Sequence, residues 1–163
     1  MIRGRWTLVF VGIAAMSMIP VTGVVADAGV DSVMPLLSTA DAGKGKKLAV
    51  RCRACHDFAK GGKNKLGPPL WNIVGNAKAA QEGFKYSSAL AAVGGEWTYE
   101  ALSAWLENPK KFVPGTKMLF AGLKKKEDRA DLIAYLRSLS DEPLALPVAD
   151  ATPVSDKPKV ITR

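Results

Sequence analysis

The chain has 163 residues, of which 48% are hydrophobic and 23% charged, a balance that excludes a disordered polypeptide and suffices for one globular domain. Lysine and arginine outnumber aspartate and glutamate by 23 to 15, and the formal net charge of +8 favours acidic partners. The chain holds two cysteines and one histidine, so few strong metal ligands are available. Cys52 and Cys55 are too close in sequence for a disulfide between them to add much stability.

Residues 1–26 have the pattern of an export segment. Arg3 and Arg5 precede 21 uncharged residues, 6–26. Pro20 and the small residues after it favour a cleaved signal peptide. The same uncharged run is also long enough for a retained membrane anchor, which needs about 20 residues. Both alternatives place the rest of the chain on the periplasmic side of the cytoplasmic membrane.

The remaining sequence divides into three parts by composition. Residues 27–40 lack a helical or strand period and contain glycine and proline, so they are predicted to be a linker. Residues 141–163 contain four prolines, which prevent a continuous helix, and form a predicted proline-rich tail. The compact domain is therefore expected at 41–140.

Three helices are predicted in this domain. Asp41 is a suitable N-cap for a helix of about three turns that ends near Cys52. Thr98 begins a second helix, which stops at Asn108-Pro109. The third has an apolar stripe formed by Leu132, Ile133, Tyr135, Leu136 and Leu139. No segment alternates as a strand, and a Gly/Pro-rich stretch of roughly forty residues separates the first two helices, so an all-α domain would need a non-protein group to fill its middle.

Cys52, Cys55 and His56 form the C-x-x-C-H pattern that attaches c-type haem. Two thiols one helical turn apart can each add to a vinyl group on the same porphyrin edge, and the next histidine can bind the iron. A zinc site would need four N or S ligands, and a thioredoxin-like dithiol would need a βαβ context; neither is present. We therefore expect one haem c, attached through both cysteines, with His56 as an axial ligand.

Met118 is the candidate for the second axial ligand. The chain has no second histidine, and Met118 is the only methionine within 41–140; the others are Met1, Met16, Met18 and Met34. It follows Pro114 and Gly115, which favour a rigid turn that could hold a thioether at the iron. The alternative is an ordinary gap-filling methionine of the core.

Taken together, these residues resemble class I cytochromes c, especially the mitochondrial type and its soluble or membrane-anchored alphaproteobacterial relatives. The resemblance covers about 43–140. Its motifs are Cys52 to His56, Leu66-Gly67-Pro68, Tyr86, Trp97, Asn108 to Lys111, Pro114 to Met118, and Arg129 to Leu136. It implies an all-α, single-haem cytochrome c fold in which the first and last helices cross, with Leu48 facing Leu132 and Tyr135.

The resemblance also implies roles for single residues around the haem. The Pro68 carbonyl would accept a hydrogen bond from the ring of His56 and fix its orientation. Tyr86 and Trp97 would donate hydrogen bonds to a haem propionate. These residues therefore complete the expected binding site.

Two positions depart from the family pattern. Trp105 stands where the family often has a tyrosine near the methionine sulfur, and a tryptophan has no phenol to donate. Asn76 stands where the family usually has an arginine near the propionates, so one compensating charge is missing. Lys78 is close enough in sequence to supply that charge, and the sequence leaves this open.

The expected function is to carry one electron between quinol–cytochrome c reductase and a terminal cytochrome c oxidase, as an electron-transfer protein and not an enzyme. Lysines flank both the cysteines and the Met118 turn, which favours docking to acidic surfaces of membrane redox complexes. The alternatives are a fixed electron-transfer subunit of a membrane complex and a donor to another periplasmic redox enzyme. A haem peroxidase would need an open sixth position and a distal acid or base. Nucleic-acid binding is not expected, because the chain carries an export pattern and no nucleic-acid module.

Overall fold

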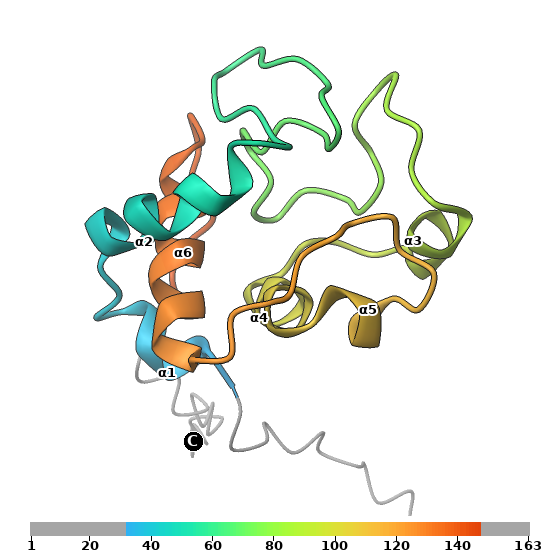
Figure 1. Cartoon of the computed structure of the whole chain (residues 1–163). Coiled ribbons are helices and arrows are strands. Elements are labelled where there is room, and N and C mark those ends of the chain that lie inside the picture. Colours follow the sequence, from blue (N-terminus) through green and yellow to red (C-terminus); the bar gives the residue numbers. More distant parts are fainter. Residues whose placement is uncertain (1–31, 148–163) are drawn as a thin grey trace, which may run out of the picture.

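The fold is taken from a computed structural model that describes residues 32–147 (Figure 1). Within this range the chain forms helices and loops, and the only strand-like pairing there is an isolated antiparallel bridge between Ala77 and Glu96. The helical segments are α1 (Met34–Leu37), α2 (Ala42–Leu48), the 3₁₀ segment η1 (Ala49–Cys52), α3 (Ser88–Val93), α4 (Tyr99–Glu107), α5 (Pro109–Phe112) and α6 (Lys126–Ser138). The predicted all-α class is confirmed.

Helix α2 begins where the sequence predicted, because Asp41 caps it. The Asp41 carboxylate accepts hydrogen bonds from the backbone N–H groups of Gly43 and Lys44, at 2.8 and 3.1 Å. The bond from Lys44 is the largest influence that lowers the pKa of Asp41, since it favours the charged carboxylate. The expected three-turn helix is not uniform: its last turn, which ends at Cys52, is 3₁₀.

Helices α2 and α6 cross and form the largest helix–helix contact of the described part (Figure 1). The two backbones meet at Gly45, where a Cβ atom would lie 1.9 Å from the Asp131 carbonyl oxygen and 2.9 Å from the Tyr135 Cβ. The expected crossing of the first and last helices of the domain is thus present, with a glycine at its closest approach. Leu48, expected to face α6, is half-buried and is not part of the core cluster.

The predicted helix at Thr98 is also present, as α4, capped by the Thr98 side chain. It ends as predicted, at Glu107, with Asn108 as its C-cap. Pro109 then begins a further short helix, α5, which the sequence did not predict. The Asn108 side chain caps this short helix by accepting a hydrogen bond from the Lys111 N–H at 3.2 Å. Proline suits the first turn of a helix, where its missing N–H has no partner to lose. Helix α3, capped by Ser87, lies in the stretch that was predicted to contain only turns.

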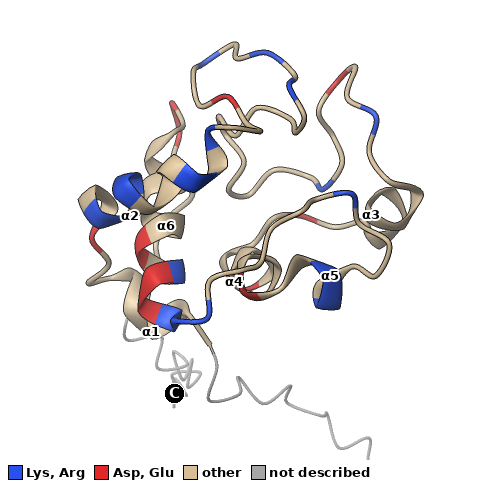
Figure 2. Cartoon of the chain, viewed as in Figure 1, with Lys and Arg blue, Asp and Glu red and all other residues tan. Residues whose placement is uncertain are grey.

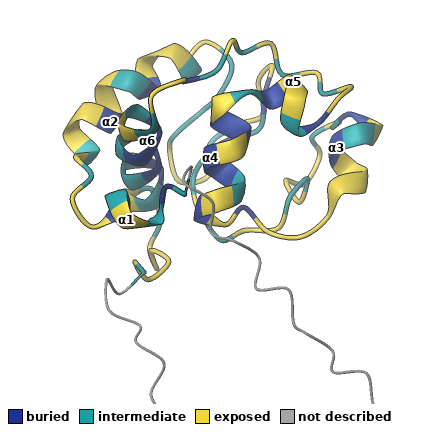
Figure 3. Cartoon of the chain, turned by 90° about the horizontal axis from the view of Figure 1, so that it is seen from below, coloured by how far each residue is buried: buried dark blue, intermediate teal, exposed yellow. Residues whose placement is uncertain are grey.

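The protein core lies between α4 and α6. Leu132 and Ile133 of α6 are 1% and 0% exposed, and Leu102 and Leu106 of α4 are 3% and 5% exposed. Figure 3 shows that exposed residues cover much of α2, whereas α6 is largely buried or half-buried. The whole apolar stripe predicted for α6 lies in or against this core.

Part of the predicted linker 27–40 belongs to the folded domain, which corrects that prediction. Val33 and Leu37 are 0% and 3% exposed, and both belong to the hydrophobic core. Pro35 lies in the first turn of α1 and helps to begin that helix instead of breaking the chain. Residues 27–31 lie outside the described residues.

The start of the predicted tail, 141–163, also packs on the domain. The Tyr99 O–H is shared between the carbonyl oxygens of Leu144 and Ala145, at 2.9 and 3.2 Å, as one bifurcated hydrogen bond. This bond ties the segment after α6 to the first residue of α4. Residues 148–163 lie outside the described residues.

The export segment, residues 1–26, is likewise outside the described part. Across residues 32–147, the structure contains no helix whose length and apolar character would allow it to cross a bilayer. The choice between a cleaved signal peptide and a retained anchor therefore stays a prediction.

Candidate functional site

The turn after η1 positions the two cysteines and the histidine. The backbone N–H groups of Cys55 and His56 both donate to the Cys52 carbonyl oxygen, at 3.0 and 2.9 Å. This closed turn places Cys52 and Cys55 one helical turn apart along the backbone, the spacing typical of attachment to one porphyrin edge. Both are unpaired thiols, and burial raises the pKa of Cys52. In the haem-bound protein thioethers would replace these thiols.

The ring of His56 is fixed by the loop that crosses beside it. Its Nδ1 lies 2.7 Å from the Pro68 carbonyl oxygen, as the family resemblance implied. Gly67 packs flat against the ring, since a Cβ atom there would lie 2.3 Å from the His56 Cε1. Burial is the largest influence on the His56 pKa and lowers it, which favours the neutral ring. With Nδ1 donating to Pro68, the lone pair of Nε2 remains available to a metal.

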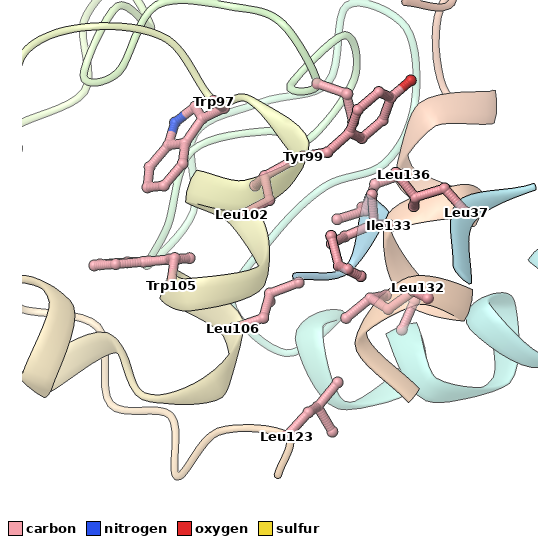
Figure 4. Close-up of a cluster of buried hydrophobic side chains, with 14 of the residues drawn as sticks. Leu37, Trp97, Tyr99, Leu102, Trp105, Leu106, Leu123, Leu132, Ile133 and Leu136 are labelled. Carbon is pink, nitrogen blue, oxygen red and sulfur yellow. The ribbon is translucent and has the colours of Figure 1, made fainter. Parts of the chain in front are cut away.

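Aromatic side chains form a wall on one side of α4. The ring centroids of Trp97 and Trp105 lie 5.4 Å apart, and that of Phe112 lies 6.5 and 6.1 Å from them. In Figure 4 both indole rings lie on the side of α4 away from α6, whereas Leu106 lies on the side toward α6. Helix α4 therefore packs against protein on one side and presents aromatic surface on the other, which suits a flat apolar group.

Trp97 and Tyr86 keep hydrogen-bond donors for a ligand. Trp97 is 6% exposed, and its indole N–H donates to no protein acceptor within residues 32–147. In that range every fully buried side-chain nitrogen or oxygen has a partner, so the Trp97 nitrogen must border accessible space. The Tyr86 hydroxyl oxygen accepts a hydrogen bond from the Gln81 N–H at 3.3 Å, and burial raises the Tyr86 pKa, which keeps its O–H protonated. Both residues could therefore donate a hydrogen bond to a haem propionate, as the family resemblance implied.

Met118 lies in the loop between α5 and α6, half-buried against the core. Its backbone N–H donates to Thr116 Oγ1 at 3.2 Å, and the Thr116 N–H donates to the Val113 carbonyl at 3.0 Å. Gly115 has a φ of +91°, a left-handed conformation that favours glycine at this turn. The next residue, Leu119, is 89% exposed, so the turn separates a half-buried thioether from a solvent-facing side chain.

After Met118 the loop is fixed to the end of α4. The Leu123 N–H donates to the Leu106 carbonyl oxygen at 2.8 Å. Gly122 lets the two backbones touch, because a Cβ atom there would lie 2.0 Å from the Glu107 carbonyl oxygen. The return path of the methionine loop is therefore defined by backbone contacts with α4.

Arg129 of α6 adds a buried clamp to this return path. The residue is 4% exposed, and its Nε donates to Ser103 Oγ at 3.0 Å. One terminal nitrogen donates to the carbonyl oxygens of Leu123 and Lys124, at 3.0 and 2.9 Å. One guanidinium thus joins α6, α4 and the end of the methionine loop.

Replacing Arg129 by leucine is expected to lower the free energy of unfolding by about 3 kcal/mol, because two carbonyls and one hydroxyl lose a charged donor. Chemical denaturation of the haem-bound protein measures this loss. Lys125→Leu is the control, since Lys125 is exposed and four residues earlier in the chain. Equal losses from the two variants would contradict the clamp.

The residues present fit a haem. They supply paired thiols, an oriented imidazole, an aromatic wall and two unused hydrogen-bond donors. Within the described range no group of three or more His, Cys, Asp or Glu side chains could hold a metal ion by itself. Sequence reasoning assigned no role to Gly67, Gly122, Phe112 or Arg129. Of these, Phe112 alone carried a periodic signal, because it lies seven residues after Trp105 on the same side of a helical pattern.

This fold and site define a class: an all-α, single-haem protein of the C-x-x-C-H type. Residues 42–140 match the family model "Cytochrome c", and the chain belongs to the cytochrome c family.

Relatives and a solved structure agree with this assignment. The chain is 47% identical over 128 residues to a cytochrome c homolog of Bradyrhizobium diazoefficiens, a match that covers 78% of this chain and 70% of that protein. It is 47% identical over 107 residues to a cytochrome c homolog of Rickettsia prowazekii, covering 66% of this chain and 61% of the relative. The structure of cytochrome cH from Methylobacterium extorquens shares 41% identity with a TM-score of 0.57, covering 61% of this chain and 99% of that one.

Family membership establishes the cofactor and the class of chemistry. The chain binds haem c covalently, and Cys52 and Cys55 are its two cysteines, in the spacing that the attachment needs. It is an electron carrier of the cytochrome c type.

Proposed function

We propose that this cytochrome carries single electrons from quinol–cytochrome c reductase to a terminal cytochrome c oxidase on the periplasmic side of the cytoplasmic membrane. The observation that carries the proposal is the His56 ring, which Pro68 orients so that its second nitrogen is free for a metal. The half-buried Met118 on its defined loop supports it. With His56 and Met118 as its two axial ligands, the iron would have no open position for a substrate, so the haem would exchange electrons without reacting with a bound substrate.

Each part of the site has a task in this function. When bound, the haem supplies a reversible one-electron couple. His56, held by Pro68, would be one axial ligand, and Met118 would be the other. The aromatic wall of Trp97 and Trp105 excludes water, which keeps the surroundings similar in both oxidation states. Little reorganisation is then needed for each transfer.

Docking is proposed to occur where the loops that follow the two ligand-bearing segments reach the surface. Leu119 and Leu66 are 89% and 82% exposed, and each lies next to a site residue, Met118 or Gly67. Exposed Lys65 adjoins Leu66 in sequence in the same way. Apolar contacts with a polar rim are typical of protein interfaces.

The distribution of charge supports an acidic partner. Residues 41–140 contain eighteen lysines and arginines and nine aspartates and glutamates. Figure 2 shows basic residues on α2, α5 and the loops, whereas acidic residues gather on α6. The exposed basic residues that flank the cysteines and the methionine loop are Lys44, Lys46, Lys47, Arg51, Arg53, Lys63, Lys65, Lys85, Lys110, Lys111, Lys117, Lys124 and Lys125. Such an arrangement raises association rates roughly 10- to 1000-fold at low salt.

Charge reversal at Lys117 or Lys124 is expected to slow electron transfer to a purified terminal oxidase by about tenfold at low salt, acting mainly on the association rate. The second-order rate constant of the unmodified protein should fall steeply between 0.01 and 0.1 M salt, because the Debye length shortens from about 30 to about 10 Å. Stopped-flow spectroscopy measures both effects.

Charge reversal at Lys157 or Lys159 is the matched control. These tail lysines lie outside 41–140, and their reversal changes the net charge by the same amount. They should have little effect on the rate. Equal losses from both pairs, or a rate that does not depend on salt, would contradict electrostatic docking and favour a tethered donor or a fixed subunit of a membrane complex.

A further inference from the structure

Lys78 is unusual among the described lysines because it is half-buried, whereas nearly all the others are exposed. Its Nζ donates to the Gly94 carbonyl oxygen at 3.0 Å and lies 5.5 Å from the centroid of the Trp97 ring. A cation within about 6 Å of an indole face is attracted by the ring quadrupole. In residues 32–147 no carboxylate lies within ion-pair distance of Lys78.

The backbone holds this lysine beside Trp97. The backbone N–H of Gly75 donates to the Trp97 carbonyl at 2.9 Å, and the backbone N–H of Trp97 donates to the Asn76 carbonyl at 2.8 Å. The Lys78 N–H then donates to the Gly95 carbonyl at 2.8 Å. These three bonds, together with the antiparallel bridge between them, fix the start of the Lys78 side chain relative to the indole.

Two glycines form the turn beside the Lys78 amine. Gly94 and Gly95 have φ values of +63° and +66°, which other residues rarely adopt. A Cβ atom at Gly95 would lie 3.4 Å from the Lys78 Nζ, an ordinary van der Waals distance, so the turn packs directly against the amine. The turn at Gly94 and Gly95 therefore holds the Lys78 ammonium group in a defined position.

Asn76 does not take over the task of the arginine that the family pattern has at its position. It is exposed, and its side-chain oxygen accepts a hydrogen bond from the Ala77 N–H at 2.8 Å. A neutral amide turned onto its own backbone supplies no positive charge. Lys78, two residues later, is the cation of this segment.

We propose that Lys78 replaces that missing arginine: its ammonium group polarises the Trp97 indole N–H as a donor to a haem propionate and offsets the propionate charge. The inference rests on the assignment of the Trp97 indole N–H, which has no acceptor within residues 32–147, to a propionate. A positive charge over the ring draws electron density from the indole and strengthens its N–H as a donor. Lys78 is thus a positioning residue that acts through Trp97.

The test is the reduction potential of the haem-bound protein, measured by spectroelectrochemistry. Lys78→Met removes the charge and keeps much of the length, and it should lower the equilibrium constant for reduction three- to tenfold. For a one-electron couple, tenfold corresponds to about 59 mV. Lys63→Met, at an exposed lysine, makes the same change in net charge and should shift the constant less than twofold.

Two further variants separate charge from structure. Lys78→Arg keeps both a cation and a donor to Gly94, and should leave the potential close to that of the unmodified protein. Asn76→Arg in the Lys78→Met background should restore the potential, because it returns a cation to the family position. Equal shifts for Lys78→Met and Lys63→Met, or no rescue by either arginine, would overturn the proposal.

These outcomes are independent of the electron-carrier proposal. The haem attachment and the methionine ligation can be followed in every variant by mass and by the ferric spectrum. If a Lys78 variant keeps the haem attachment and the methionine ligation but has an unchanged reduction potential, the role of Lys78 is contradicted. The electron-carrier proposal is then unaffected. A lower free energy of unfolding without a shift in reduction potential would also overturn the proposal. It would mean that Lys78 only stabilises the fold through its hydrogen bond to Gly94.

Discussion

Met118→Ala is expected to open the sixth coordination position of the iron. The weak charge-transfer band near the red edge of the ferric spectrum, which reports methionine sulfur on iron, should disappear. The reduction potential should fall by on the order of 0.1 V, a fraction of the roughly 0.8 V over which axial ligands tune haem. Peroxidase activity should rise, because a peroxide can then reach the metal.

The control for this variant keeps the loop and changes a neighbour. Leu119→Ala alters a side chain that is 89% exposed, so the ferric band should persist. Survival of the band in Met118→Ala would show that the ligand is another residue. Loss of the band in both variants would mean that the loop, and not the sulfur atom, was disturbed.

Gly45→Ala is expected to destabilise the fold by about 3 kcal/mol, near the upper end of the range for an overpacked core. The added Cβ would lie 1.9 Å from the Asp131 carbonyl oxygen, a backbone atom that cannot rotate away. Helices α2 and α6 would have to separate, and the turn that carries Cys52 and His56 follows directly from α2. Chemical denaturation of the haem-bound protein measures the loss.

Lys46→Ala is the matched control, since it introduces the same residue into the same helix at an exposed position. Its effect should stay within about 0.5 kcal/mol, as for most surface changes. A Gly45→Ala protein as stable as this control would show that the crossing tolerates a wider separation than the structure gives.

The haem-attachment motif and the starts of the helices could be predicted from the sequence because they depend on residues close together in the chain. The spacing of Cys52, Cys55 and His56 depends on a single turn, and that turn is closed by bonds within five residues. The caps Asp41 and Thr98 act on N–H groups two or three residues away. Met118 was found by elimination, which needed only the composition, and its ligation stays a prediction.

Tertiary contacts explain why parts of the predicted linker and tail pack on the domain. Val33 and Leu37 carry too short a pattern to predict a helix, and only the surface of the core shows that they are buried. Nothing in the sequence near Leu144 points to the Tyr99 hydroxyl, which is 45 residues away. Such short segments pack on the domain only through contacts with residues that are distant in the sequence, so their local pattern does not predict them.

Close backbone approaches were also beyond sequence reasoning. A glycine in a sequence can mark a turn, a bulge or a contact, and the pattern around Gly45 and Gly122 does not say which. The folded chain places each of them against a carbonyl oxygen of another segment, Asp131 or Glu107. Glycine is needed at each position because the opposing carbonyl oxygen leaves no space for a Cβ atom.

The sequence by itself determined the class of this protein: an all-α cytochrome c with one covalently attached haem, because attachment depends on residues adjacent in the chain. Only the tertiary structure decided how the pocket is lined and where single charges lie. Lys78 and Trp97 are nineteen residues apart, and their contact depends on the paired backbone between them. Local spacing sets the covalent chemistry, whereas long-range packing sets the electrostatic surroundings in which it works.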